Sequence, residues 1–244
     1  MRLGRRLEDD AAAGGNFSSI SWHRASLVRA HCAPTREFGR ASRTNAPGAH
    51  VASDNGLGAE RAASGVALLV IDMISCWSFP DAEKLLPGAV AIAPNIAVLK
   101  ARCARACVPV IYANDNMGRW RSDFASLVAM SLDCGGNVAA VTTALRPSER
   151  DYFVLKPKHS AFYATPLALL LRDLQVRRLI VCGVASDQCV MSSVAEARMR
   201  DIDVVVPRDC VASQTHQRND VALQQFAEVF KLKTPLARRL ALPS

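Results

Sequence analysis

The sequence predicts an α/β fold with three layers, α/β/α, in which a doubly wound, mostly parallel sheet of about six strands lies between helices. Two observations support this fold class. Short apolar runs alternate along the chain with longer segments of helical periodicity, which is typical of parallel strands joined by right-handed crossover helices. The apolar runs are continuous, as expected for strands covered on both faces.

The first 64 residues differ from the rest of the chain. They are rich in Ala, Arg, Ser and Gly and show no sustained periodicity, so they cannot bury enough apolar surface to order themselves. We expect a disordered N-terminal extension over 1–64, or a start codon placed too far upstream, and one domain over 65–244. An organelle transit peptide is disfavoured because Glu8, Asp9 and Asp10 are acidic.

The first half of the domain is predicted from the spacing of its apolar residues. Continuous apolar runs of a few residues indicate buried strands, and apolar residues three or four apart indicate helices. Pro109 comes at a strand start, where a missing N–H is tolerated. In order, we expect strand 66–71, helix 87–106, strand 108–112, a polar loop 114–121, helix 123–130 and an irregular or partly helical stretch 131–150.

The second half repeats the alternation. Thr165 is suited to cap a helix that starts at Pro166, and Thr215 or His216 starts the last helix. In order, we expect strand 151–155, a helix from 166, strand 178–182, a helix from 189 to about 200, strand 203–207, a helix to about 228 and a sixth strand over 229–232.

The composition of the chain indicates its cellular compartment and the classes of partner to expect. The chain has 244 residues, of which 50% are hydrophobic, enough for one sizeable core. No apolar run approaches the about 18 residues of a membrane span, so we expect no membrane. The eight cysteines form no C-x-x-C pair and no signal peptide opens the chain, which favours free thiols in a reducing, cytoplasmic protein. The net charge of +8 comes from scattered basic residues, so we expect no nucleic acid.

The stretch 179–200 carries the strongest chemical signal. An apolar strand ends at Gly183, a short turn follows, and a helix begins at or near Cys189. A cysteine at this position lies at the carboxyl edge of the sheet, where α/β folds bind ligands. The helix N-terminus favours a thiolate, and its free N–H groups are suited to hold an oxyanion. A buried structural cysteine is the alternative.

Three motifs resemble those of the isochorismatase-like cysteine hydrolases, the family that includes nicotinamidases and N-carbamoylsarcosine amidases. They are GVASDQCV from Gly183, VIDM ending the first strand, and KPKHSAF from Lys156, within residues 65–234. The resemblance implies that Cys189 is the nucleophile, Asp72 the acid and base, and Lys156 the third catalytic residue. Lys158 is the rival lysine, but the family places its lysine directly after the strand.

The resemblance also implies the reaction. It implies a cis peptide bond between Val184 and Ala185 and an oxyanion hole formed by the N–H groups of Ala185 and Cys189. An amide or ureido C–N bond of a small molecule would be hydrolysed through a thioester, without a cofactor, in a homo-oligomer (a dimer or tetramer). Two alternatives remain: a binding or assembly protein that has lost turnover, and enol-ether hydrolysis as in true isochorismatases, which need no cysteine nucleophile.

Two departures from the family pattern concern the pocket. Ser75-Cys76-Trp77 replaces an Asn-Asp-Phe type segment, so the substrate cannot be transferred from a relative. The loop Asn114-Asp115-Asn116 has no nearby histidine, so we expect no metal. Arg119 and Arg121 are candidates for binding a substrate carboxylate, although solvated loop arginines are more common. The expected substrate-binding residues are Trp77, Phe79, Asn116, Trp120, Phe162 and Tyr163.

Overall fold

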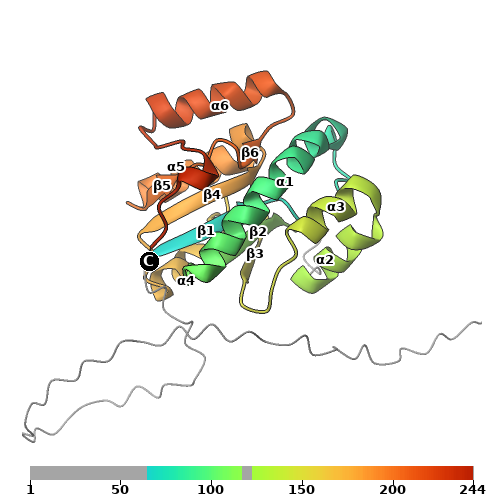
Figure 1. Ribbon diagram of the computed structural model, residues 1–244, viewed down its shortest axis with the longest axis horizontal. Coiled ribbons are helices and arrows are strands. Elements are labelled where there is room, and N and C mark those ends of the chain that lie inside the picture. The colour runs from blue at the N-terminus through green and yellow to red at the C-terminus, as the bar shows by residue number, and fades with distance from the viewer. Residues whose placement is uncertain (1–64, 117–122, 244) are drawn as a thin grey trace, which may run out of the picture. The chain divides into compact units, whose positions relative to one another are not determined.

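The computed structural model describes residues 65–116 and 123–243. The described residues form one parallel sheet with helices on both faces (Figure 1), which confirms the predicted fold class. Strand order is β3-β2-β1-β4-β5, with β6 paired to β4. The bounds are β1 Val66–Ile71, β2 Val110–Asp115, β3 Tyr152–Lys156, β4 Arg178–Val184, β5 Asp203–Val205 and β6 Val211–Ala212.

The two faces of the sheet carry separate apolar cores. Val66, Leu68 and Val70 of β1 pack on one face, and the intervening residues of β1 pack on the other. Because side chains alternate along a strand, each buried strand supplies both cores. The first core contains α1 (Ala82–Arg105), α2 (Phe124–Asp133) and α3 (Gly136–Ala144), and the second contains α4 (Leu167–Asp173), α5 (Met191–Met199) and α6 (His216–Glu228).

Helix α1 begins five residues before the predicted start. We expected it at residue 87 from the spacing of the apolar residues, but Ala82 and Leu85 are also buried in the core, and the helix extends on the N-terminal side of Pro87. By length and composition alone this helix is also apolar enough to cross a membrane. Here its buried face, which includes Ile92 and Ile96, packs on the sheet.

The predicted sixth strand over 229–232 is wrong. Val229 is 72% exposed, and the chain after α6 makes one parallel bridge, from Lys233 to Val205. The sixth strand is β6, which pairs with β4 beyond the end of β5. Two residues are too short a run to show a strand pattern in the sequence.

The cysteines partly match the expectation. Six cysteines of the described ranges are free. Cys107 is disulfide-bonded, which corrects the expectation of free thiols at that position. The predicted N-terminal extension over 1–64 and the loop residues Arg119, Trp120 and Arg121 lie outside the described residues.

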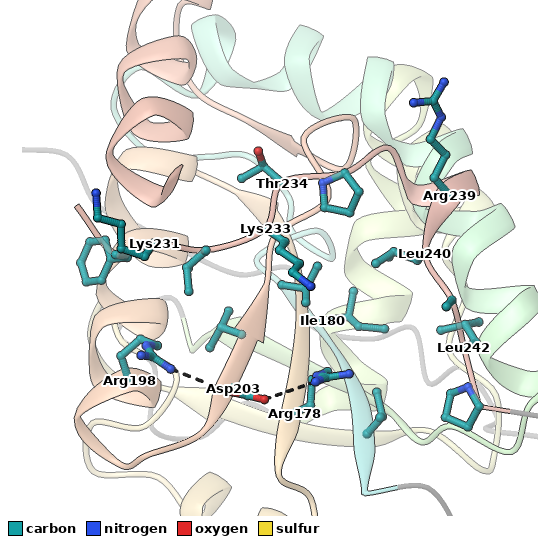
Figure 2. A pocket seen from close by; sticks show the side chains of 18 residues that line it. Arg178, Ile180, Arg198, Asp203, Lys231, Lys233, Thr234, Arg239, Leu240 and Leu242 are labelled. Carbon is teal, nitrogen blue, oxygen red and sulfur yellow. Dashed lines mark hydrogen bonds and ion pairs between the residues drawn. The ribbon is translucent and has the colours of Figure 1, made fainter. Parts of the chain in front are cut away.

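A hollow of about 1100 Å³ lies between β4, β5 and the C-terminal segment (Figure 2). Asp203 pairs there with Arg178 at 3.3 Å and with Arg198 at 3.9 Å. Arg178 and Asp203 begin their strands, so this hollow lies toward the amino ends of β4 and β5. It is therefore separate from the carboxyl ends, where the predicted catalytic residues lie.

Candidate active site

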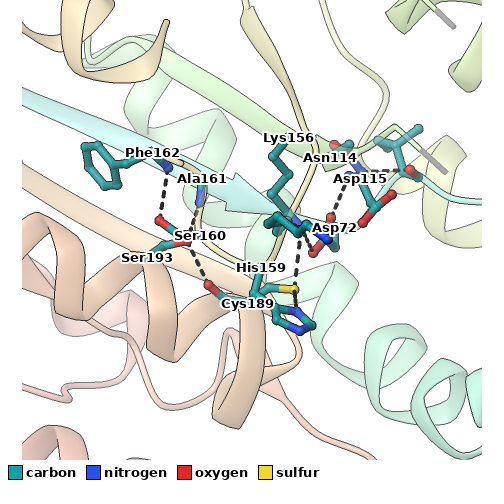
Figure 3. A network of polar contacts seen from close by, with 12 residues as sticks. Asp72, Asn114, Asp115, Lys156, His159, Ser160, Ala161, Phe162, Cys189 and Ser193 are labelled. Atoms are coloured by element: carbon teal, nitrogen blue, oxygen red, sulfur yellow. Dashed lines mark hydrogen bonds and ion pairs between the residues drawn. The ribbon is translucent and has the colours of Figure 1, made fainter. Parts of the chain in front are cut away.

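The three predicted catalytic residues come from three different strand ends. Asp72 directly follows β1, and Lys156 is the last residue of β3. Cys189 lies in the π-helical turn η1 (Ser186–Val190), between β4 and α5. Because all of these strands are parallel, their carboxyl ends meet at one edge of the sheet, and Figure 3 shows the side chains together there.

Lys156 bridges the other two residues. Its Nζ lies 2.8 Å from Asp72 Oδ2 and 3.5 Å from Cys189 Sγ, and it donates a third hydrogen bond to the Lys158 carbonyl at 3.2 Å. The Lys156 side chain is fully buried. Burial lowers the pKa of Lys156, but the charge of Asp72 and its hydrogen bond to the ammonium outweigh burial, and the pKa is raised. Lys156 is therefore an ammonium ion at neutral pH.

Asp72 is held in place by the end of β2. The Asp115 N–H donates to its Oδ1 at 2.8 Å, while Oδ2 faces Lys156. The neighbouring Asn114 amide donates to the Ile74 carbonyl at 2.7 Å, which fixes the chain just after Asp72. The carboxylate therefore has a defined orientation toward the lysine and the thiol.

The Cys189 thiol is neutral in this site. Burial raises its pKa, Asp72 raises it further, and Lys156 only partly opposes them, so that the pKa is about 12. This corrects the expectation that the helix N-terminus favours a thiolate. A neutral thiol must lose its proton before its sulfur can act as a nucleophile, and Asp72 is the neighbouring carboxylate.

Alkylation as a function of pH tests this neutral thiol. Because the pKa of Cys189 is about 12, the thiolate fraction rises about tenfold for each pH unit from 7 to 9. We expect the rate of Cys189 carbamidomethylation by iodoacetamide to rise accordingly, without levelling off. The exposed thiol of Cys134 is the internal control and should react faster at pH 7. Fast labelling of Cys189 with a plateau below pH 8 would contradict the neutral thiol.

The turn that carries Cys189 is tied to two neighbouring elements. Its first carbonyl, that of Ala185, accepts from Gln188 N and Val190 N, and the peptide bond between Val184 and Ala185 is cis. Asp187 accepts from Arg218 Nε at 2.6 Å and from the Ser213 hydroxyl, which joins the turn to the start of α6. Sequence reasoning missed this ion pair because its partners are 31 residues apart.

The loop after β3 is tied to α5. Ser160 Oγ donates to Glu196 Oε2 at 2.6 Å, and Ala161 N donates to Ser193 Oγ at 2.9 Å. Ser193 Oγ in turn donates to the Cys189 carbonyl at 2.7 Å. The sequence held a signal for this network, because Ser193 and Glu196 fall four and seven residues after Cys189 and so lie on one helix face.

Ser193→Ala tests whether this network holds the site together. The substitution removes one buried and one partly buried hydrogen bond, so we expect it to lower the free energy of unfolding by about 1–3 kcal/mol. Urea denaturation measures this change. Ser192→Ala is the matched control, since Ser192 precedes it on α5 and has no part in the network. Equal costs for the two variants would show that the hydroxyl of Ser193 does not bind the loop.

His159 is the polar neighbour of the thiol that sequence reasoning missed. Its Nδ1 lies 3.5 Å from Cys189 Sγ, and the residue is exposed to solvent. The sequence places it inside the lysine motif, where we expected a surface or motif residue. Only the distance between two separate loops shows that it faces the thiol.

The predicted substrate-binding residues lie in different surroundings. Trp77 is buried, and its ring lies 6.0 Å from that of the partly exposed Phe79. Asn116 is buried beside Lys156, whose carbonyl accepts from its N–H at 3.2 Å. Phe162 packs in the core on the α4–α6 face, under Arg200, and Tyr163 is exposed. Trp120 is outside the described residues, and a binding role for this set stays a prediction.

Comparison with known proteins establishes the family. The Isochorismatase domain model matches residues 66–234, most of the described domain. The chain belongs to the isochorismatase family. Its relatives include the uncharacterized isochorismatase family protein YaaI of Bacillus subtilis, 37% identical over 164 residues, which cover 67% of this chain and 89% of YaaI. The resemblance predicted from the three motifs is thus confirmed.

Other isochorismatase-family relatives are amidohydrolases. Maleamate amidohydrolase of Pseudomonas putida is 30% identical over 164 residues, covering 63% of this chain and 76% of that protein. The structure of N-carbamoylsarcosine amidase from Thermoplasma acidophilum superposes with a TM-score of 0.56 at 23% identity, covering 72% of this chain and 98% of that one. The second likeness concerns the fold, and the chain is an isochorismatase-family hydrolase.

The site of this isochorismatase-family hydrolase combines three chemical capacities. Cys189 offers a neutral thiol, Asp72 a carboxylate that can take its proton, and Lys156 a buried cation that holds the carboxylate. Within the described ranges, no three His, Cys, Asp or Glu side chains are grouped as a metal-ligand set. The arrangement suits nucleophilic attack on a carbonyl carbon.

Proposed function

We propose that this protein is a cysteine-dependent amidohydrolase that cleaves an amide or ureido C–N bond of a small molecule through a thioester intermediate. The observation that carries the proposal is the bridging position of Lys156, 3.5 Å from Cys189 Sγ and 2.8 Å from Asp72 Oδ2. The names of the relatives, maleamate amidohydrolase and N-carbamoylsarcosine amidase, support a C–N bond as the target.

In the first half-reaction, Cys189 Sγ attacks the substrate carbonyl and Asp72 takes the thiol proton. The attack places negative charge on the carbonyl oxygen, which we assign to the N–H groups of Ala185, directly before the helical turn η1, and of Cys189, within that turn. Asp72 then gives the proton to the leaving nitrogen as the C–N bond breaks. The products are a thioester on Cys189 and an amine or ammonia.

In the second half-reaction, water attacks the thioester carbon and the C–S bond breaks. The acyl group leaves as a carboxylic acid, and Cys189 returns to the neutral thiol. Apart from the attacking water, both steps draw only on side chains and main-chain N–H groups of the chain. The proposed partner is therefore a small-molecule substrate, without a cofactor.

A panel of small carboxamides and ureido compounds tests this function. We expect at least one compound to be converted to its carboxylate with stoichiometric ammonia release, measured by a coupled ammonia assay. Breakdown of an enol ether without ammonia would favour the isochorismatase-type reaction instead. Ligands that raise the melting temperature without any turnover would favour a binding protein, a possibility kept open by the altered segment Ser75-Cys76-Trp77.

A further inference from the structure

The sulfur of Cys189 has two nitrogen neighbours at the same distance. Lys156 Nζ and His159 Nδ1 each lie 3.5 Å from Sγ (Figure 3). The proposed reaction uses the lysine and Asp72 but gives no role to the histidine. The second half-reaction, in turn, still lacks a group that activates water and returns a proton to Sγ.

The His159 side chain lies beside Cys189 Sγ although it is exposed to solvent. The carbonyl of Lys158, just before it, accepts from Lys156 Nζ at 3.2 Å. Ser160, just after it, donates to Glu196 of α5 at 2.6 Å. Both chain neighbours are thus tied to elements that position Cys189. The imidazole therefore combines a fixed place beside Sγ with access to solvent.

The other two groups near Sγ are less suited to activate water. Lys156 is fully buried, and its raised pKa keeps it protonated, so it cannot accept a proton from water. Asp72 adjoins the thiol, but its side chain is only 17% exposed, so it has less access to water than the exposed His159. A neutral imidazole can both accept and return a proton near neutral pH.

We propose that His159 is the general base of thioester hydrolysis, which takes a proton from the attacking water and returns it to Cys189 Sγ. As the water oxygen bonds to the acyl carbon, one of its protons moves to Nδ1. The C–S bond then breaks, its electron pair goes to Sγ, and the proton on Nδ1 follows. The products are a carboxylic acid, a neutral thiol and a neutral imidazole. The inference rests on the proposed cysteine mechanism.

The weak acidity of the Cys189 thiol explains why breaking the C–S bond requires a proton donor beside Sγ. Because burial and Asp72 raise the pKa of Cys189 to about 12, its thiolate is a poor leaving group. A donor beside Sγ lowers the cost of breaking the C–S bond, since a neutral thiol departs instead. His159 Nδ1 is placed to be that donor.

Acylation by p-nitrophenyl acetate separates the two half-reactions without knowledge of the natural substrate. Release of p-nitrophenolate in a burst reports thioester formation, and the later steady rate reports hydrolysis. For His159→Asn we expect the burst rate to stay within about threefold of the parent while the steady rate falls roughly a hundredfold. Acetyl-Cys189 should accumulate and be detected by peptide mass spectrometry.

Chemical rescue and a matched control sharpen the test. In His159→Gly, added imidazole should restore the steady rate but leave the burst unchanged, because the vacated position opens to solvent. His216→Asn, at the exposed start of α6, should behave like the parent in both phases. Melting temperatures of all variants check that the fold is retained.

The outcomes distinguish this inference from the proposed function. A parent burst with an unchanged steady rate in His159→Asn would overturn the role of His159 alone. Equal losses in both phases, without rescue by imidazole, would also overturn it and show that His159 positions the thiol. A parent protein with no burst that depends on Cys189 would overturn the cysteine mechanism and this inference with it.

Discussion

Replacing Cys189 by alanine is expected to lower kcat/KM for the substrate by at least about a thousandfold. The substitution removes the only sulfur within hydrogen-bonding distance of Lys156 among the described residues, so no thioester can form. The fold should survive, since Asp72 and Lys156 still pair with each other at 2.8 Å. Steady-state kinetics with the compound that the panel identifies, together with the melting temperature, measures both effects.

Cys134→Ala is the matched control for this loss. Cys134 is a free, exposed cysteine that follows α2, and its removal should leave kcat/KM unchanged within about twofold. If Cys189→Ala kept more than a tenth of the parent rate, water would be attacking the substrate directly. The nucleophilic role of Cys189 would then be wrong.

Replacing Gly183 by alanine is expected to be the most damaging single-methyl addition in the domain. Gly183 has φ +114°, and a Cβ built there would lie 2.0 Å from the Ile71 carbonyl oxygen. Ile71 directly precedes Asp72, so the collision pushes apart the strand ends that carry Asp72 and Cys189. We expect the free energy of unfolding to fall by more than about 3 kcal/mol, with loss of activity in any folded protein.

Gly135→Ala separates the collision from backbone strain. Gly135 also has a positive φ, +69°, but a Cβ there would meet nothing within 4 Å. With φ +69° and ψ −173°, Gly135 lies in a backbone region that is essentially restricted to glycine, so strain alone should cost about 1–3 kcal/mol. Urea unfolding of the two variants gives the comparison, and equal costs would show that the close approach of β4 to β1 does not depend on the absence of a side chain at Gly183.

The convergence of the three proposed catalytic side chains at one sheet edge was predictable from the sequence. Asp72, Lys156 and Cys189 each follow or end an apolar run, and parallel strands bring their carboxyl ends to one edge. The convergence thus follows from strand direction alone, without knowledge of any loop. The motif resemblance then selected Lys156 over Lys158, and Lys156 is the lysine whose Nζ lies beside Asp72 and Cys189.

Features that depend on distances between separate segments were not predictable. The contact of His159 with Sγ and the ion pair of Asp187 with Arg218 join loops that the sequence cannot place relative to each other. The expectation of a thiolate at Cys189 was wrong for the same reason, since its pKa is raised. A helix N-terminus is visible in the sequence, whereas burial of the thiol and the neighbouring Asp72 carboxylate are not.

The short elements were missed for another physical reason. Residues 229–232 are apolar enough for a strand. Among the described residues that follow α6, however, only Lys233 pairs with the sheet, through its bridge to Val205 of β5. Two-residue β6 is defined by its pairing with β4 and not by any pattern of its own. The substrate pocket is similarly a property of loops, so the sequence could not show that Phe162, a predicted pocket residue, packs against the core on the α4–α6 face.

Trapping the covalent intermediate tests the central claim most directly. The protein is mixed with the carboxamide or ureido compound that releases ammonia, quenched in acid during turnover, and digested for peptide mass spectrometry. The account predicts an acyl group on the peptide that contains Cys189, formed before the carboxylic product and absent from Cys189→Ala. Sustained ammonia release with no acyl group on Cys189 at any quench time would contradict a thioester mechanism.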